Sequence, residues 1–161
     1  MREQVMQPPP PADTSIPLAA LLLGVGGVIP FLLPTVAIVA SWRPPGLPPP
    51  TLALQAYGAV ILSFLGGVRW GLALRLAGRR QALALAGSVL PALLAWVALL
   101  VSPPYLGLPV LAALFLLVGL ADLRIGALEA PPWYRRLRIG LTAAVVVLLT
   151  VAFLAAPTLP R

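Results

Sequence analysis

Residues 81–121 read QALALAGSVLPALLAWVALLVSPPYLGLPVLAALFLLVGLA, and these 41 consecutive residues carry no charged side chain. As one α-helix the segment would reach roughly 60 Å, about twice the thickness of the hydrocarbon core of a bilayer. Ser102-Pro103-Pro104 interrupts it near its centre, and proline cannot continue a helix interior. The segment therefore predicts two membrane-spanning helices joined by a tight turn.

Three further apolar segments flank this pair, and each is long enough to cross a bilayer as a helix. The chain has 161 residues, of which 60% are hydrophobic and 9% are charged. Soluble domains carry about 25% charged residues, so the composition also favours a membrane protein. We predict an all-α integral membrane protein, a bundle of five transmembrane helices at about 16–42, 52–74, 82–101, 105–121 and 134–156.

The first apolar segment contains Pro30 and Pro34, so we expect a helix that is kinked near its middle. It is longer than the apolar region of about 7–15 residues in a secretory signal peptide, and we interpret it as a spanning helix. Residues 1–15 include four consecutive prolines and no apolar periodicity, which predicts a disordered tail. We expect one membrane domain over residues 16–156 and a short C-terminal tail at 157–161.

Arginine is the only basic residue in the chain, and it is distributed unevenly between the two sides of the predicted bundle. One side of the predicted bundle is rich in arginine, and the other side has only Arg43 and Arg161. Short loops on the cytoplasmic side of a membrane are rich in basic residues. We therefore predict a cytoplasmic N-terminus and an external C-terminus in a bacterial inner membrane. Eight arginines support this orientation, namely Arg2, Arg75, Arg79, Arg80, Arg124, Arg135, Arg136 and Arg138.

The chain contains no cysteine and no histidine. This excludes disulfides, thiol nucleophiles, Cys or His metal sites, and the most common general base near neutral pH. We therefore expect no catalytic residue, no metal site and no cofactor. A net charge of +7 would favour nucleic acid as the partner of a soluble protein. Here anionic lipid headgroups account for the arginines, so we expect membrane lipids and no nucleic acid.

Arg69 is the one charge inside the apolar stretches of the five predicted spans, and the last of these stretches begins at residue 139. It lies about 9 Å from the helix end near Arg75. Arginine at the centre of a membrane helix costs about 2.5–3.5 kcal/mol and usually faces a partner or water. Three interpretations remain open: extension to the headgroups, an internal ion pair, or a site for an anion or substrate. Asp122 lies at the same depth and is the candidate ion-pair partner, with Ser63 and Gln55 as further members of an intramembrane polar site.

Small residues recur at every fourth position of the second span, at Ala59, Ser63, Gly67 and Gly71. This spacing predicts a helix-packing ridge, because small side chains let a second helix approach closely in lipid. The ridge is consistent with a contact inside the bundle. It is also consistent with a seam between this chain and a membrane-protein partner or a second copy.

Aromatic and basic residues gather between Asp122 and Arg138. We interpret this segment as an interfacial anchor and orientation signal, with a specific site for acidic headgroups as the alternative. The anchor comprises Trp133, Tyr134, Arg135, Arg136 and Arg138.

Four segments of the chain resemble the domain of unknown function 3429 family, the transmembrane protein 69-like inner-membrane proteins. They are Gly27-Val28-Ile29-Pro30-Phe31, the stretch from Tyr57-Gly58-Ala59 to Trp70-Gly71, Ser88-Val89-Leu90-Pro91 with Trp96, and the stretch from Pro132-Trp133-Tyr134 to Leu141-Thr142. The resemblance covers about residues 16–155. It implies a multi-span inner-membrane protein, and it implies no particular activity.

Three functions remain open on the sequence alone. The chemistry excluded above favours a non-enzymatic binding or assembly component of the inner membrane. The alternative is a small transporter or permease component that handles an anionic solute or lipid near Arg69. An enzyme acting on lipid, with Asp122 and Glu129 at the interface, is less well supported, because no base accompanies Ser63 or Ser88 in the sequence.

Overall fold

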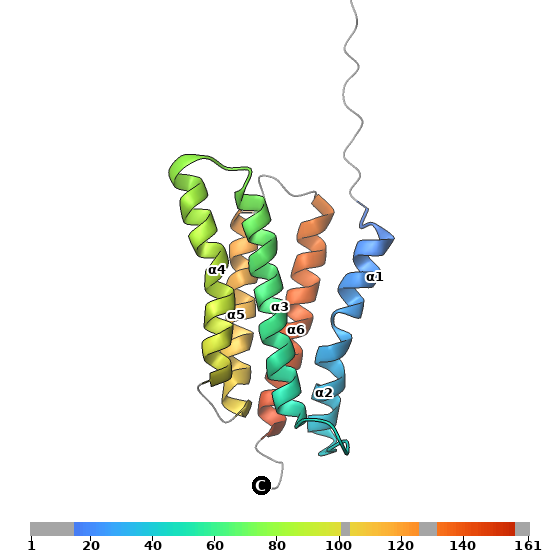
Figure 1. The fold of residues 1–161 in the computed structure, drawn as a ribbon. Coiled ribbons are helices and arrows are strands. Elements are labelled where there is room, and N and C mark those ends of the chain that lie inside the picture. Colours follow the sequence, from blue (N-terminus) through green and yellow to red (C-terminus); the bar gives the residue numbers. More distant parts are fainter. Residues whose placement is uncertain (1–14, 101–103, 126–131, 157–161) are drawn as a thin grey trace, which may run out of the picture.

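A computed structural model describes residues 15–100, 104–125 and 132–156 of the chain, and this part is built entirely from helices and short links. Five helices are long and apolar enough to span a membrane, which confirms the predicted fold class. Neighbouring spans run in opposite directions, so the first and last described residues lie at opposite ends of the bundle (Figure 1). The elements are α1 (Leu18–Gly26), α2 (Ile29–Val39), α3 (Pro50–Ala73), α4 (Gly78–Leu100), α5 (Pro104–Ile125) and α6 (Pro132–Ala155).

The predicted tails fall largely outside the described residues, at 1–14 and 157–161, as does part of the predicted turn at Ser102-Pro103.

The first span consists of two helices, α1 and α2, stacked end to end (Figure 1). The sequence predicts a kink near Pro30 and Pro34, whereas the interruption lies just before them, at Gly27 and Val28. Pro30 sits in the first turn of α2, because it has no N–H to bond to the preceding turn and its ring would clash there. The Tyr57 hydroxyl on α3 donates a hydrogen bond of 3.1 Å to the carbonyl of Gly27, which holds the broken point against the bundle.

Several helices are longer than their apolar segments, and these bounds correct the prediction. Helix α4 begins at Gly78 rather than at 82, so Arg79 and Arg80 lie in its first turn. Helix α5, which follows α4 in the chain, continues to Ile125 rather than ending at 121, and this places Asp122 within the helix. Hydropathy marks where side chains become polar, but the helical backbone continues because its hydrogen bonds remain favourable at the membrane surface.

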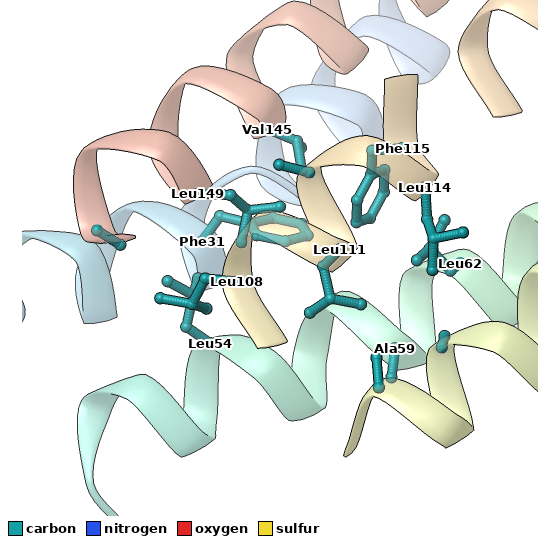
Figure 2. Close-up of a cluster of buried hydrophobic side chains, with 14 of the residues drawn as sticks. Phe31, Leu54, Ala59, Leu62, Leu108, Leu111, Leu114, Phe115, Val145 and Leu149 are labelled. Atoms are coloured by element: carbon teal, nitrogen blue, oxygen red, sulfur yellow. The ribbon is translucent and has the colours of Figure 1, made fainter. Parts of the chain in front are cut away.

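The core lies where α2, α3, α5 and α6 meet, around Phe31 of α2 (Figure 2). The ring of Phe31 contacts Tyr57 and Phe115 edge to face, with centroids 4.9 and 5.7 Å apart. This geometry is favourable for aromatic pairs. Leucine side chains that are fully buried fill the remaining space, namely Leu54, Leu62, Leu108, Leu111 and Leu149.

Two buried polar side chains, Gln55 and Thr35, are bonded to backbone carbonyls. Gln55 donates from Nε2 to the carbonyl of Ala98 at 2.8 Å, and Thr35 donates to Phe31 at 2.8 Å. Such bonds are required because hydrocarbon offers no water to replace them. The opposite surfaces of the helices expose large apolar side chains, among them Leu33, Phe64, Leu90, Trp96, Leu117 and Val147.

Candidate functional site

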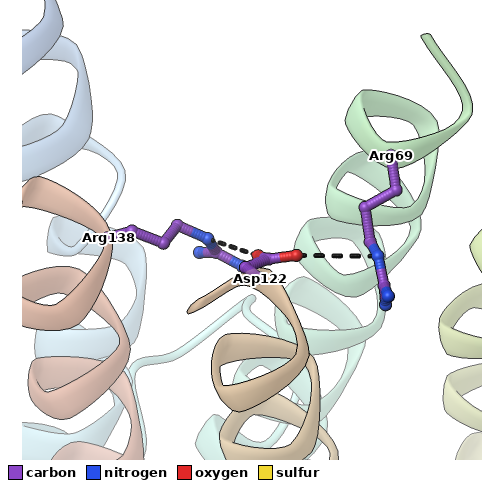
Figure 3. A network of polar contacts seen from close by, with 3 residues as sticks. All are labelled: Arg69, Asp122 and Arg138. Carbon is purple, nitrogen blue, oxygen red and sulfur yellow. Dashed lines mark hydrogen bonds and ion pairs between the residues drawn. The ribbon is translucent and has the colours of Figure 1, made fainter. Parts of the chain in front are cut away.

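A charged cluster lies at one end of the bundle, where α3 and α5 end and α6 begins. Arg69 lies one turn before the end of α3, Asp122 lies in the last turn of α5, and Arg138 lies in the second turn of α6. Figure 3 shows the two arginines approaching the carboxylate of Asp122 from opposite sides. Three helices therefore converge on one carboxylate.

Asp122 uses a different oxygen for each arginine. Nε of Arg138 donates a hydrogen bond of 2.9 Å to Oδ2, and Nε of Arg69 lies 3.6 Å from Oδ1. The first contact is a charge-assisted hydrogen bond, whereas the second is a looser ion pair. The side chains of Arg69, Asp122 and Arg138 are 17%, 11% and 10% exposed, so all three charges lie largely away from solvent. Two guanidinium groups against one carboxylate leave the cluster with a net charge of +1.

Two buried polar atoms beside the cluster have no hydrogen-bond partner among the described residues, Nη2 of Arg138 and Oγ1 of Thr142. Thr142 follows Arg138 by one helical turn on α6, so both side chains project from the same face. That face meets α5 at Gly119. A Cβ added at Gly119 would lie 3.1 Å from Oγ1 of Thr142, so the threonine occupies the space that the glycine leaves.

The structure places Arg69 and Asp122 together but separates them from the other two residues of the predicted polar site. Gln55 lies near the opposite end of α3, where its amide packs over Gly107 and bonds Ala98. Ser63 is exposed on the outer face of α3 and donates a hydrogen bond of 2.9 Å to the carbonyl of Ala59 in its own helix. Neither side chain belongs to the charged cluster.

The predicted packing ridge on α3 is a contact inside the bundle only at Ala59, which is 6% exposed. Ser63, Gly67 and Gly71 are exposed, and a Cβ added at either glycine would meet no atom within 4 Å. The close approach to α4 runs through Gly66 instead, where an added Cβ would lie 2.5 Å from the carbonyl oxygen of Ser88. Adjacent positions on a helix differ by about 100°, so the ridge faces away from the helix that packs on α3.

The predicted interfacial anchor forms the first two turns of α6. Trp133 and Tyr134 contact each other edge to face at 6.2 Å, and Arg135 and Arg136 are exposed. Arg138 differs from this group because it is buried and bonded to Asp122, so its assignment to the anchor is wrong.

The sequence prediction does not include Thr142 in the polar site and places Arg138 in the anchor, although their spacing on α6 is a signal for both. The buried residues of α6 recur at intervals of three and four, at Arg138, Thr142, Val145, Leu149 and Ala152. This spacing is typical of the inward face of a helix. Arg138 is the one arginine of 135–138 that falls on it.

These features define a polytopic α-helical membrane protein with a buried charged cluster at one end. Over residues 16–154 the sequence matches the family described as protein of unknown function (DUF3429). The chain belongs to this family.

Two relatives in this family are both called transmembrane protein 69. The protein of Xenopus tropicalis is 40% identical over 134 residues, which cover 81% of this chain and 51% of that protein. The protein of Mus musculus is 32% identical over 125 residues, covering 76% of this chain and 50% of that protein. The chain therefore spans about half the length of these relatives. No solved structure matches the sequence significantly.

Proposed function

We propose that the protein is a non-enzymatic binding or assembly component of a bacterial inner membrane, and that it binds at its arginine-rich end. The observation that carries this proposal is the buried Nη2 group of Arg138, which has no acceptor among the described residues. A buried donor of this kind is costly unless something accepts its hydrogen bond. It lies in a cluster with one excess positive charge, so the cost is offset when a negatively charged group binds.

The environment of the polar side chains supports binding over catalysis. Ser63 and Ser88 donate to carbonyls of their own helices, at Ala59 and Leu85, and a serine without an adjacent base is a weak nucleophile. Asp122 is engaged by an arginine at each oxygen, so it is poorly placed to accept a proton from a substrate.

The packing of the bundle also favours binding over transport. A transport path through a membrane protein needs polar groups along its length. Between the charged cluster and the other end of the bundle, the space between the helices is filled by Phe31, Phe115 and leucine side chains. The buried Gln55 and Thr35 are bonded to backbone carbonyls rather than lined up along a path.

The distribution of arginine supports a bacterial inner membrane with the charged cluster on the cytoplasmic side. Arg75, Arg79 and Arg80 lie at the same end of the bundle as the cluster, in and after the link from α3 to α4. Arg43 lies at the other end, in the link from α2 to α3. An excess of arginine at one end is the pattern that orients membrane proteins.

The proposal is tested with the full chain in nanodiscs and in liposomes. Native mass spectrometry of the nanodiscs is expected to detect a bound lipid, ligand or protein, together with the copy number of the chain. Liposomes that contain the protein are expected to release chloride, phosphate or sulfate no faster than empty liposomes. Flux that depends on the protein would overturn the proposal in favour of transport, and a chain that carries no bound component would overturn it as well.

A further inference from the structure

We propose that the cluster of Arg69, Asp122 and Arg138, together with Thr142, binds a phosphate oxyanion. This inference rests on the proposed binding function and names the ligand chemistry of that same site. The phosphate group has two sources, the headgroup of a membrane phospholipid and free inorganic phosphate.

The first argument is the geometry of the contact between Arg138 and Asp122. A carboxylate usually accepts two parallel hydrogen bonds from one guanidinium. Here Oδ2 of Asp122 accepts a hydrogen bond from Nε of Arg138 and Oδ1 lies toward Arg69. Nη2 of Arg138 is left without an acceptor among the described residues. The guanidinium is held in place by one bond and still offers donors to a second oxygen-rich group. Phosphate is such a group, because its oxygens match the planar fork of arginine.

Thr142 supplies a second donor on the same face of α6. Its hydroxyl oxygen is buried and has no partner among the residues that the structure describes. Two unsatisfied polar groups one turn apart are unusual in a membrane helix, since each costs free energy in a dry environment. A tetrahedral oxyanion accepts hydrogen bonds at several oxygens, so one that reaches both Nη2 of Arg138 and Oγ1 of Thr142 would satisfy them together.

Charge and depth favour phosphate over a neutral ligand. The cluster has a net charge of +1, and a phosphodiester carries one negative charge. Arg69 is the most exposed member, and its contact with Asp122 is 3.6 Å long, so its guanidinium can turn toward an incoming anion while Arg138 stays fixed. The exposed Arg135 and Arg136 lie just before Arg138, at the end of the bundle where lipid phosphates are concentrated.

The experiment uses the full chain in a maltoside detergent, which contains no phosphate. Short-chain phosphatidylglycerol and sodium phosphate are titrated separately at constant ionic strength, with sodium chloride as the control, and the melting temperature is followed. We expect saturable stabilisation by at least one phosphate compound and none by chloride. Stabilisation by phosphatidylglycerol alone identifies a headgroup site, and stabilisation by sodium phosphate identifies a site for the free ion.

Variants link the response to the cluster. Arg138→Gln is expected to weaken phosphate binding by about tenfold or more, because it removes a charged donor. Arg135→Gln removes the same charge from an exposed position of the same helix and is expected to change the affinity by less than about twofold. Should Arg138→Gln fail to fold, Thr142→Val keeps the shape of the side chain without its hydroxyl and is expected to weaken binding several-fold.

The inference is overturned when the wild-type chain responds to neither phosphate compound, or when Arg135→Gln weakens binding as much as the variants of the cluster. A chain that retains some other ligand or a protein partner in nanodiscs but ignores phosphate would keep the proposed function and remove this inference. Protein-dependent flux in liposomes would remove the proposed function itself, so the two failures are distinguishable.

Discussion

We expect Asp122 to contribute more to the stability of the fold than either arginine of the charged cluster, because its carboxylate separates two buried guanidinium groups. Charges that lose their partner in a dry site are far more costly than the pair itself is stabilising. Removal of Arg69 would leave a neutral pair of Arg138 and Asp122, still joined by the 2.9 Å hydrogen bond. Removal of Asp122 would leave two like charges facing each other.

We predict that Asp122→Asn lowers the free energy of unfolding by about 3 kcal/mol, and that Arg69→Gln lowers it by about 1 kcal/mol or less. Asp122→Asn keeps the side-chain volume, whereas Arg69→Gln shortens the side chain, so a larger loss for Asp122→Asn reports charge rather than volume. Unfolding in mixed micelles of mild detergent and sodium dodecyl sulfate measures both values. A larger loss for Arg69→Gln than for Asp122→Asn would mean that the carboxylate does not organise the cluster.

The sequence alone predicts part of this site. Arg69 and Asp122 stand at the same depth once the spans are counted, and depth follows from hydropathy and a rise of 1.5 Å per residue. The sequence places Arg138 in the interfacial anchor, because aromatic and basic residues gather around it. Its burial depends on which face of α6 meets α5, and this orientation is set by packing between helices rather than by composition.

At the scale of the helix, two adjacent glycines of α3 lie on different faces. Gly66 faces α4 at a distance that excludes a side chain, whereas Gly67 faces away from the bundle. The four-residue spacing from Ala59 to Gly71 therefore predicts a row of small residues of which only Ala59 packs inside the bundle, and a seam with a partner or a second copy stays a prediction. The four-residue spacing alone does not show which row of small residues, the one through Gly66 or the one through Gly67, packs against another helix.

Two alanine substitutions on α3 separate these faces. Gly66→Ala is expected to destabilise the protein by about 2 kcal/mol, because the new methyl group would press against the backbone carbonyl of Ser88. Gly67→Ala is the matched control and is expected to leave stability unchanged or raise it by up to about 1 kcal/mol. Thermal unfolding in detergent checks both. Equal losses at the two positions would show that Gly67 also has a close neighbour in the folded protein.

For the whole molecule, the number of spans is determined by length and hydropathy, because a bilayer admits only helices that satisfy their own backbone. The helix ends were less predictable, since α4 and α5 continue past the first charged or polar side chains. The bundle has an odd number of spans, so the first and last described residues of the chain lie on opposite sides of the membrane. The proposed orientation then rests on where the arginines gather.

The absence of cysteine makes the proposed orientation directly measurable when the chain is expressed in a bacterium. Leu47→Cys lies in the link from α2 to α3, and Ala77→Cys lies in the link from α3 to α4; both positions are exposed, and neither change removes an arginine. In intact spheroplasts a membrane-impermeant maleimide is expected to label Leu47→Cys at once, and Ala77→Cys only after permeabilisation.

The opposite pattern would invert the proposed orientation and move the charged cluster to the external surface. Phosphate could then reach it only from outside the cell. Labelling of both positions from one side would contradict α3 as a spanning helix, because these two links lie at its opposite ends. The same pair of variants therefore tests the helix arrangement and the side from which the cluster is reached.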